Sequence, residues 1–225
     1  MFESKYSKVL TAILIIVIVA ILGLLGFLAY DYYQKATVTA DTADFVDNFE
    51  NQVANGQGET QNDGDEDSED PLSEIQQAST GGNGASSTKV TYKGYGVLGT
   101  MEIPATNFKY PILEAPPTTK KLNTSVVYLF GTAEGINKPG NVVIVGHNYR
   151  NGLFFSNNKK LNIGDKIYVS DNSGNKLTYT IYNKFETTPE DTSFYQRDTG
   201  GKAELTLSTC TDDSKARTII LAKED

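Results

Sequence analysis

A single apolar run dominates the first 30 residues. From Val9 to Tyr30 the chain has 22 residues without a charge, most of them Ile, Leu, Val or Ala. A helix of this length, rising about 1.5 Å per residue, crosses a hydrocarbon core about 30 Å thick. The apolar region of a secretory signal peptide is usually shorter, about 7–15 residues. The pattern therefore predicts an uncleaved transmembrane signal anchor over residues 9–30, with a cleaved signal peptide as the alternative.

Charges beside this run predict its orientation. Lys5 and Lys8 precede it, whereas the charged residues that follow are acidic apart from Lys35. Because positive residues are retained on the cytoplasmic side of a membrane, residues 1–8 are expected in the cytoplasm and the rest of the chain outside the cell. The sequence thus predicts a single-pass protein of the cell membrane.

Residues 31–88 have the composition of a tether. Twelve Asp and Glu residues occur between Lys35 and Lys89, eight of them from Glu59 to Glu74, with no Lys or Arg. From residue 55 the segment has too few apolar residues to bury the surface that would offset its ordering entropy. We predict an acidic, extracellular and largely disordered linker. A cation site or partner site in the acidic run is the alternative.

One short stretch of this linker has a helical pattern. Phe45, Phe49 and Val53 recur every four residues after Asp41, which is a suitable helix cap. This spacing predicts a short amphipathic helix near the membrane.

Residues 89–225 show the short, regularly spaced apolar runs of a β domain. Clusters of Gly, Pro, Asn and Asp separate the runs, and residues 171–175 predict a hairpin turn. Only residues 118–123 and 154–160 leave room for short helical turns. The fold class is therefore mainly β, an eight-stranded barrel or sandwich with short helices, preceded by one transmembrane helix. The predicted strands are 95–103, 108–113, 126–130, 141–146, 166–169, 176–185, 204–209 and 218–222.

Charge and composition exclude several functions. The β domain has 17 Lys and Arg against 14 Asp and Glu, a net charge of +3, while the whole chain carries -8. No basic stripe indicates a nucleic-acid partner. One cysteine and one histidine exclude an internal disulfide and a Cys/His zinc cluster. The absence of a Cys-x-x-Cys motif disfavours thioredoxin-like redox chemistry.

Three reactive side chains lie where strands are predicted to end. His147 follows the apolar run 142–145, Cys210 follows the alternating segment 205–209, and Arg217 begins the last strand. A tight loop between Cys210 and Arg217 would bring these two residues to adjacent positions on neighbouring strands. The spacing predicts that all three side chains converge at one end of the domain.

Such a trio can carry out nucleophilic catalysis. A free thiol with a pKa of about 8.5 needs a nearby cation or histidine to become reactive at neutral pH. Cys210 would attack a carbonyl, His147 would protonate the leaving amine, and Arg217 would hold the substrate or the developing oxyanion. Each residue also has an ordinary interpretation, as a core cysteine, a hydrogen-bonded histidine or a solvated edge arginine.

The cysteine segment resembles a family signature. Residues 205–210 read Leu-Thr-Leu-Ser-Thr-Cys and, with Arg217 downstream, resemble the Thr-Leu-x-Thr-Cys motif and arginine of the sortases. Gly146 and His147 at a strand end are similar to the histidine region of that family. The resemblance spans most of residues 95–223 and implies an eight-stranded sortase β-barrel as the catalytic domain, residues 89–225.

The resemblance also implies an activity. Sortases are membrane-tethered cysteine transpeptidases of Gram-positive cell surfaces, which cut a Leu-Pro-x-Thr-Gly (LPxTG) sorting motif between Thr and Gly. They hold the cut protein as a thioacyl-enzyme and pass it to an amine. The expected partners are surface proteins with a C-terminal sorting motif and a peptidoglycan precursor or other amine acceptor. The family chemistry requires no cofactor.

Roles for individual residues follow from the same resemblance. It implies Cys210 as the nucleophile, His147 as general acid and base, and Arg217 as the residue that positions substrate and stabilises the oxyanion. Thr209 is implied as a substrate contact through its hydroxyl or backbone, with strand packing as the alternative role.

The class within the family is less defined by the sequence. The one Asp-Pro pair, at residues 70–71, is followed by leucine, so the Asp-Pro-aromatic lid of pilin-type class C enzymes is absent. The connection 185–204 is short for a class B insertion, which favours a housekeeping or class D-like role with class B as the alternative. Glu186, Glu190 and Asp191 resemble the calcium-binding cluster of some sortases, but three carboxylates in such a turn-rich segment are more often solvated, and no metal is expected.

Two rival functions use the same residues differently. A cysteine endopeptidase would release the acyl group to water instead of an amine. A non-catalytic surface binding module would need only the β domain and its stalk, and the Cys, His and Arg would be incidental.

Overall fold

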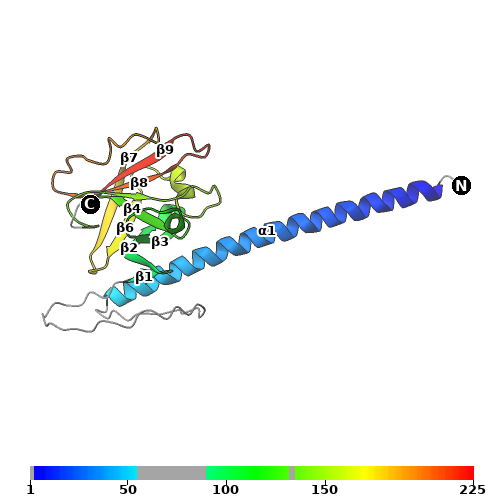
Figure 1. Cartoon of the computed structure of the whole chain (residues 1–225), viewed down its shortest axis with the longest axis horizontal. Coiled ribbons are helices and arrows are strands. Elements are labelled where there is room, and N and C mark those ends of the chain that lie inside the picture. Colours follow the sequence, from blue (N-terminus) through cyan, green and yellow to red (C-terminus); the bar gives the residue numbers. More distant parts are fainter. Residues whose placement is uncertain (1–2, 55–89, 132–134) are drawn as a thin grey trace, which may run out of the picture.

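The computed structural model describes residues 3–54, 90–131 and 135–225. It consists of a long N-terminal helix, α1 (Glu3–Ala54), and a β-barrel that lies against the C-terminal part of this helix (Figure 1). Most of the predicted disordered linker, from residue 55 to 88, lies outside the described residues.

The barrel is built from a single sheet. Its strands follow the order β1-β2-β3-β4-β5-β8-β9-β7-β6, and a further pairing of β2 with β6 closes β2 to β9 into an eight-stranded barrel. The predicted mainly β, eight-stranded barrel is therefore confirmed. β1 adds a two-residue strand that pairs with β2. The strands are β1 (Thr91–Tyr92), β2 (Tyr95–Ile103), β3 (Phe108–Leu113), β4 (Val126–Phe130), β5 (Gly140–Val145), β6 (Lys166–Asp171), β7 (Lys176–Thr187), β8 (Ala203–Cys210) and β9 (Arg217–Glu224).

Each predicted strand is present, with ends that differ from the prediction by at most two residues. The predicted hairpin joins β6 to β7 in antiparallel pairing, and Gly174 in its turn has a φ of 86°, a left-handed conformation that favours glycine. The two predicted helical turns are also present, as α2 (Thr119–Leu122) and the 3-10 helix η2 (Phe155–Lys160). A further 3-10 turn, η1 (Pro104–Thr106), joins β2 to β3.

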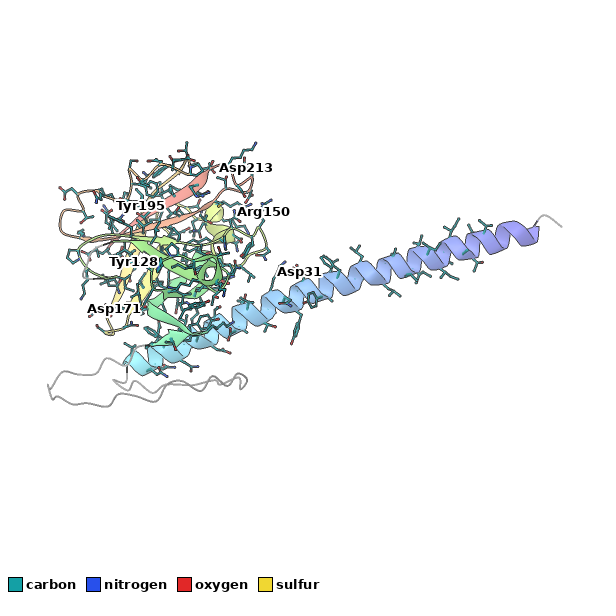
Figure 2. All side chains as sticks on the ribbon, viewed as in Figure 1. Asp31, Tyr128, Arg150, Asp171, Tyr195 and Asp213 are labelled. Carbon is teal, nitrogen blue, oxygen red and sulfur yellow. The ribbon has the colours of Figure 1, made fainter. Side chains whose placement is uncertain are left out.

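Two strand pairings place the candidate residues at one end of the barrel. β5 and β8 run parallel, with Val145 opposite Ser208, so the residues that follow both strands leave the barrel at the same edge. β8 and β9 form an antiparallel hairpin whose last pair joins Cys210 to Arg217. Arg150 and Asp213, in the loops after β5 and β8, mark this end in Figure 2, whereas Asp171 in the β6–β7 hairpin lies away from it.

The central strands are buried on both faces, as the continuous apolar run of β5 predicts. Val143 and Ile144 are fully buried, and Ile144 joins the central core of the barrel together with Leu207 of β8. On the outside of β9, Ile219 and Leu221 pack with Phe194 from the β7–β8 connection. Burial of this apolar surface, at about 25 cal/mol per Å², is the main force that holds the strand ends in place.

Helix α1 differs from the sequence expectation. We predicted a spanning segment that ends at residue 30 and a separate short helix near Asp41, but α1 continues without a break to Ala54. Residues 31–54, assigned to the linker, are therefore helical. The predicted apolar stripe explains this, because Phe45, Phe49 and Val53 pack against a cluster on the barrel that includes Tyr92, Val97, Leu113 and Val127.

Charge complementarity reinforces the docking of α1. Asp47 forms an ion pair with Lys109 of β3, and Glu50 forms one with Lys176 of β7 at 2.9 Å. Asp41 accepts a hydrogen bond from the hydroxyl of Tyr92 at 2.7 Å. Several acidic residues that the sequence assigned to a solvated tether thus contact the barrel.

The N-terminal part of α1 is apolar and stands free of the barrel. It contains one segment long and apolar enough to cross a membrane, and the large side chains from Val9 to Leu28 are exposed. Figure 2 shows these side chains projecting from the helix on the N-terminal side of Asp31. An N-terminal helix of this kind fits the single-pass membrane anchor predicted from the sequence.

Candidate active site

Cys210 and Arg217 form a direct contact at the end of the barrel. They are paired residues at the turn of the β8–β9 hairpin, and Nη1 of Arg217 donates a hydrogen bond to Sγ of Cys210 at 3.1 Å. Both residues are half-buried. A guanidinium keeps its charge at all physiological pH values and stabilises negative charge that forms on the sulfur or on a nearby oxygen.

His147 leaves β5 at the same end. The amide of Gly146 donates to the carbonyl of Ser208 at 3.3 Å, which extends the β5–β8 contact to the residue before the histidine. The imidazole is half-buried, and its ring lies 4.8 Å from the ring of Tyr149, centroid to centroid. Desolvation lowers the pKa of His147 below its ordinary value of 6.5, so the imidazole is mainly neutral at pH 7.

Among the described residues, His147 and the Cys210–Arg217 pair lie at the same end of the barrel but do not form a closed triad. The contact of Arg217 with Cys210 is direct, while no hydrogen bond among the described residues joins the imidazole of His147 to the thiol. Catalytic hydrogen bonds are often long in structures without substrate and tighten in the complex.

Position 146 requires glycine because a side chain there would clash with its neighbours, and not because of the backbone conformation. A Cβ on this residue would lie 2.8 Å from the ring of Phe155 and 2.9 Å from Val126. Phe155 is fully buried, and its amide donates to the carbonyl of His147 at 3.0 Å. The loop that carries the histidine therefore packs directly on the barrel core.

Thr209 is buried, with 4% of its surface exposed. Its hydroxyl donates to the carbonyl of Gly146 at 2.7 Å, so the proton of that hydroxyl is already engaged. This geometry favours the alternative role that the sequence left open, in which Thr209 packs the strands. Its contact with substrate stays a prediction.

Asn148 is a site residue to which the sequence analysis gave no role. Its Nδ2 donates to the carbonyl of Cys210 and to Oδ1 of Asp212, each at 3.0 Å. These bonds connect the histidine loop to the segment just after β8. The signal in the sequence was only its position directly after the histidine, because its partners lie more than 60 residues away.

A polar cluster fastens the β7–β8 connection to the first halves of β5 and β8. Arg197 donates to Glu204 at 2.5 Å, to Thr206 at 3.0 Å and to the carbonyl of Phe194 at 2.9 Å. Asn141 donates to the carbonyl of Tyr195, the residue after Phe194, at 2.9 Å. The connection is thus held firmly over β5 and β8.

Tyr195 in this connection lies within electrostatic range of Arg217. The ring of Tyr195 lies 5.4 Å from that of Phe130 at the end of β4. Burial raises the pKa of the Tyr195 hydroxyl, while the charge of Arg217 acts in the opposite direction. Tyr195 and Phe130 therefore form an aromatic pair that joins the β7–β8 connection to the end of β4.

The suggested calcium cluster is not assembled. The residues that the structure describes contain no group of three His, Cys, Asp or Glu side chains that could hold a metal ion. Asp191 instead accepts hydrogen bonds from the hydroxyl of Thr187 at 2.5 Å and from the amide of Ser193 at 2.9 Å. Its carboxylate organises the turn after β7.

Comparison with known proteins identifies the family. The fold is a β-barrel with cysteine, histidine and arginine at one end, and the family model for the sortase domain matches residues 101–225. The chain belongs to the sortase family. It is 31% identical over 115 residues to sortase A of Bacillus anthracis, a match that covers 51% of this chain and 52% of the relative. The chain thus spans about half the length of that curated relative.

Solved structures support the same fold. A sortase D5 transpeptidase of Clostridium perfringens is 28% identical, with a TM-score of 0.51 over 57% of this chain and 79% of that one. Sortase C-1 of Actinomyces oris is also 28% identical, with a TM-score of 0.52 over 57% of this chain and 73% of that one. Proteins named for two different classes match equally well, so the likeness does not select a class.

Proposed function

We propose that this chain is a membrane-anchored cysteine transpeptidase that cleaves an LPxTG-like sorting motif between Thr and Gly and transfers the surface protein to a cell-wall amine. The observation that carries the proposal is the 3.1 Å contact between Nη1 of Arg217 and Sγ of Cys210. It places a permanent cation beside the one thiol of the chain, at the strand ends from which His147 also emerges. Membership of the sortase family supports the same chemistry.

In the first half of the reaction, Sγ of Cys210 attacks the carbonyl carbon of the motif threonine. The proton of the thiol passes to the neutral imidazole of His147, and Arg217 stabilises the oxyanion that forms on the carbonyl oxygen. The C–N bond then breaks, and the imidazolium gives its proton to the departing glycine amine. A thioester joins the surface protein to the cysteine.

In the second half, an amine of the peptidoglycan precursor or another acceptor attacks the thioester. His147 accepts a proton from the attacking nitrogen and returns it to the sulfur as the C–S bond breaks. A new amide bond forms, and the free thiol is restored. If water takes the place of the amine, the same steps describe the rival endopeptidase.

The N-terminal half of α1 supports the membrane location. Exposed Tyr30 ends the apolar segment and exposed Tyr32 and Tyr33 follow it, and tyrosine is enriched where helices leave the hydrocarbon core. Lys5 and Lys8 before the segment favour a cytoplasmic N-terminus and an extracellular barrel. We propose a class D-like enzyme, with class B as the alternative, because the sequence lacks the class C lid triplet.

The test uses the full chain in detergent micelles with fluorogenic peptides that carry LPxTG variants, with and without a short amine such as triglycine. Mass spectrometry identifies the products, and Cys210→Ala is the control. Cysteine-dependent cleavage after Thr with the amine joined to the new end supports transpeptidation. Cleavage that yields only the free acid would favour the endopeptidase, and a lack of cleavage with an unreactive Cys210 would favour the binding module.

A further inference from the structure

His147 lies between two residues that are each hydrogen-bonded to the strand that carries Cys210. On one side, the carbonyl of Gly146 accepts the hydroxyl of Thr209 at 2.7 Å. On the other side, Nδ2 of Asn148 donates to the carbonyl of Cys210 at 3.0 Å. The backbone of the histidine is therefore tied at both flanks to the cysteine and to the residue before it.

Asn148 uses both ends of its amide in this arrangement. Besides its bond to Cys210, Nδ2 donates to Oδ1 of Asp212 at 3.0 Å, and Oδ1 accepts the amide of Arg150 at 3.0 Å. A side chain with donors and an acceptor on one short stem is required, which fits asparagine but not aspartate or leucine. One side chain thus joins its own loop to the β8–β9 loop.

Asp212 is suited to its part in this link. Hydrogen bonds from Lys159 and Asn148 lower the pKa of its carboxyl group, which is therefore charged at neutral pH and can only accept. The ammonium of Lys159, which lies at 2.5 Å, comes from η2. The link from the histidine loop thus continues through Asp212 to the 3-10 helix below it.

We propose that Asn148 is a positioning residue that fixes the separation between the imidazole of His147 and the thiol of Cys210. It contacts no reacting atom and acts through the backbone of its neighbours. The inference rests on the proposed function, because it assigns Asn148 to the same cysteine and histidine chemistry.

The physical reason is the demand of proton transfer on distance. A general acid or base works within about 2.6–3.2 Å of its partner, and a displacement of about 1 Å can cost about a hundredfold in rate. The regular pairing of β5 with β8 ends at Val145 and Ser208. Beyond this pair, hydrogen bonds from side chains take the place of the backbone hydrogen bonds between the strands. Without the side-chain amide of Asn148, the residue after His147 would lose its hydrogen bond to Cys210 at the end of β8.

The chain offers two single-copy probes for the test, since it has one histidine and one cysteine. Carbon-13 labelling of the imidazole gives one NMR signal for His147, and methylthiolation modifies Cys210 alone. In the wild-type chain, we expect methylthiolation of Cys210 to shift the His147 signal. In Asn148→Ala, we expect a smaller shift, together with a kcat for transpeptidation at least about tenfold lower and a KM within about threefold of wild type.

A matched control is available in the same loop. Asn151 accepts the amide of Leu153 at 3.0 Å through its own side chain but forms no hydrogen bond to β8 among the described residues. Asn151→Ala removes a similar bond and is expected to keep kcat and the NMR response of the wild type. If Asn148→Ala does not fold, Asn148→Asp gives the same size without the donors. Asp212→Asn added to it restores the bond between positions 148 and 212, but not the bond to the carbonyl of Cys210. The double variant is expected to be more active than Asn148→Asp alone.

The outcomes separate this inference from the proposed function. Wild-type kcat and an unchanged NMR response in Asn148→Ala, with Cys210→Ala inactive, would overturn the positioning role and leave the enzyme intact. A rise in KM with constant kcat would also overturn it, because it would make Asn148 a substrate contact. Activity that persists in Cys210→Ala would overturn the proposed function itself.

Discussion

Arg217 donates a hydrogen bond to Cys210 across the β8–β9 hairpin, with Nη1 of the guanidinium 3.1 Å from the sulfur. The contact is fixed by strand register, because the two residues are the last pair before the hairpin loop. A planar guanidinium offers several donors in a rigid fork, so it can hold the sulfur and still have donors for a substrate oxygen.

Replacement of Arg217 by lysine is therefore expected to impair catalysis although the charge is kept. An ammonium is a point charge on a flexible stem and does not hold sulfur and oxyanion in the fixed geometry of the guanidinium fork. We expect Arg217→Lys to lower kcat by about a hundredfold, and Arg217→Ala by more. Steady-state transpeptidation kinetics on the folded variants would check this, and a lysine variant with wild-type kcat would refute the assignment.

The burial of His147 predicts a dependence of stability on pH. Its pKa is lowered in the folded state by desolvation, so protonation favours the unfolded chain. The stability of the barrel is thus fully present above pH 6.5 and is lost progressively as the pH falls below 6.5. Urea unfolding between pH 5 and 7 should show a decline that is smaller in His147→Gln, and an identical decline in both proteins would exclude His147 as its source.

Gly146→Ala is expected to disturb both stability and activity. The added methyl group would overlap the buried ring of Phe155, so the loop or the ring must move, at a cost of about 1–3 kcal/mol. His147 comes next in the chain, so a shift of this loop would displace its imidazole. Thermal unfolding and kcat should both fall, whereas Gly152→Ala in the same loop, where a Cβ has space but φ is 94°, tests backbone strain alone.

The docking of α1 can be tested at Phe49, which is 1% exposed. Phe49→Ala removes a large side chain from the contact between helix and barrel, and comparable changes cost about 3–5 kcal/mol. We expect residues 41–54 to become sensitive to limited proteolysis while the barrel stays resistant. Asn48→Ala, at an exposed neighbouring position, is the control, and equal protection in both variants would show that Phe49 does not hold the helix.

Much of the barrel could be predicted because its signals are local. Alternation of apolar residues and the turn residues between them are sufficient to give the eight strands to within two residues. The pairing of Cys210 with Arg217 was also accessible, since a short loop joins adjacent strands. The two-residue strand β1 (Thr91–Tyr92) was not, because so short a segment has no periodicity.

The features that sequence reasoning missed depend on distant contacts. The helix beyond residue 30 was assigned to a tether because its acidic residues are solvated in isolation, yet Glu50 pairs with Lys176, 126 positions away. Asn148 likewise has its partners at Cys210 and Asp212. A pattern within one window contains no information on such pairs until the fold brings them together.

In a membrane-anchored chain, the unbroken helix α1 would give the barrel a defined distance from the membrane and a defined orientation. A flexible tether of about 24 residues has an end-to-end distance that varies around about 25–30 Å. Helix α1 instead fixes this distance and the rotation, because it rises by about 1.5 Å and turns by about 100° with each residue. Because α1 packs on the barrel through residues 41–53, a tilt of the proposed spanning segment in a bilayer would also tilt the end of the barrel that carries Cys210. Insertion of one residue between 34 and 40 would rotate that end about a quarter turn around the helix axis, so the length of this segment determines which way the barrel faces.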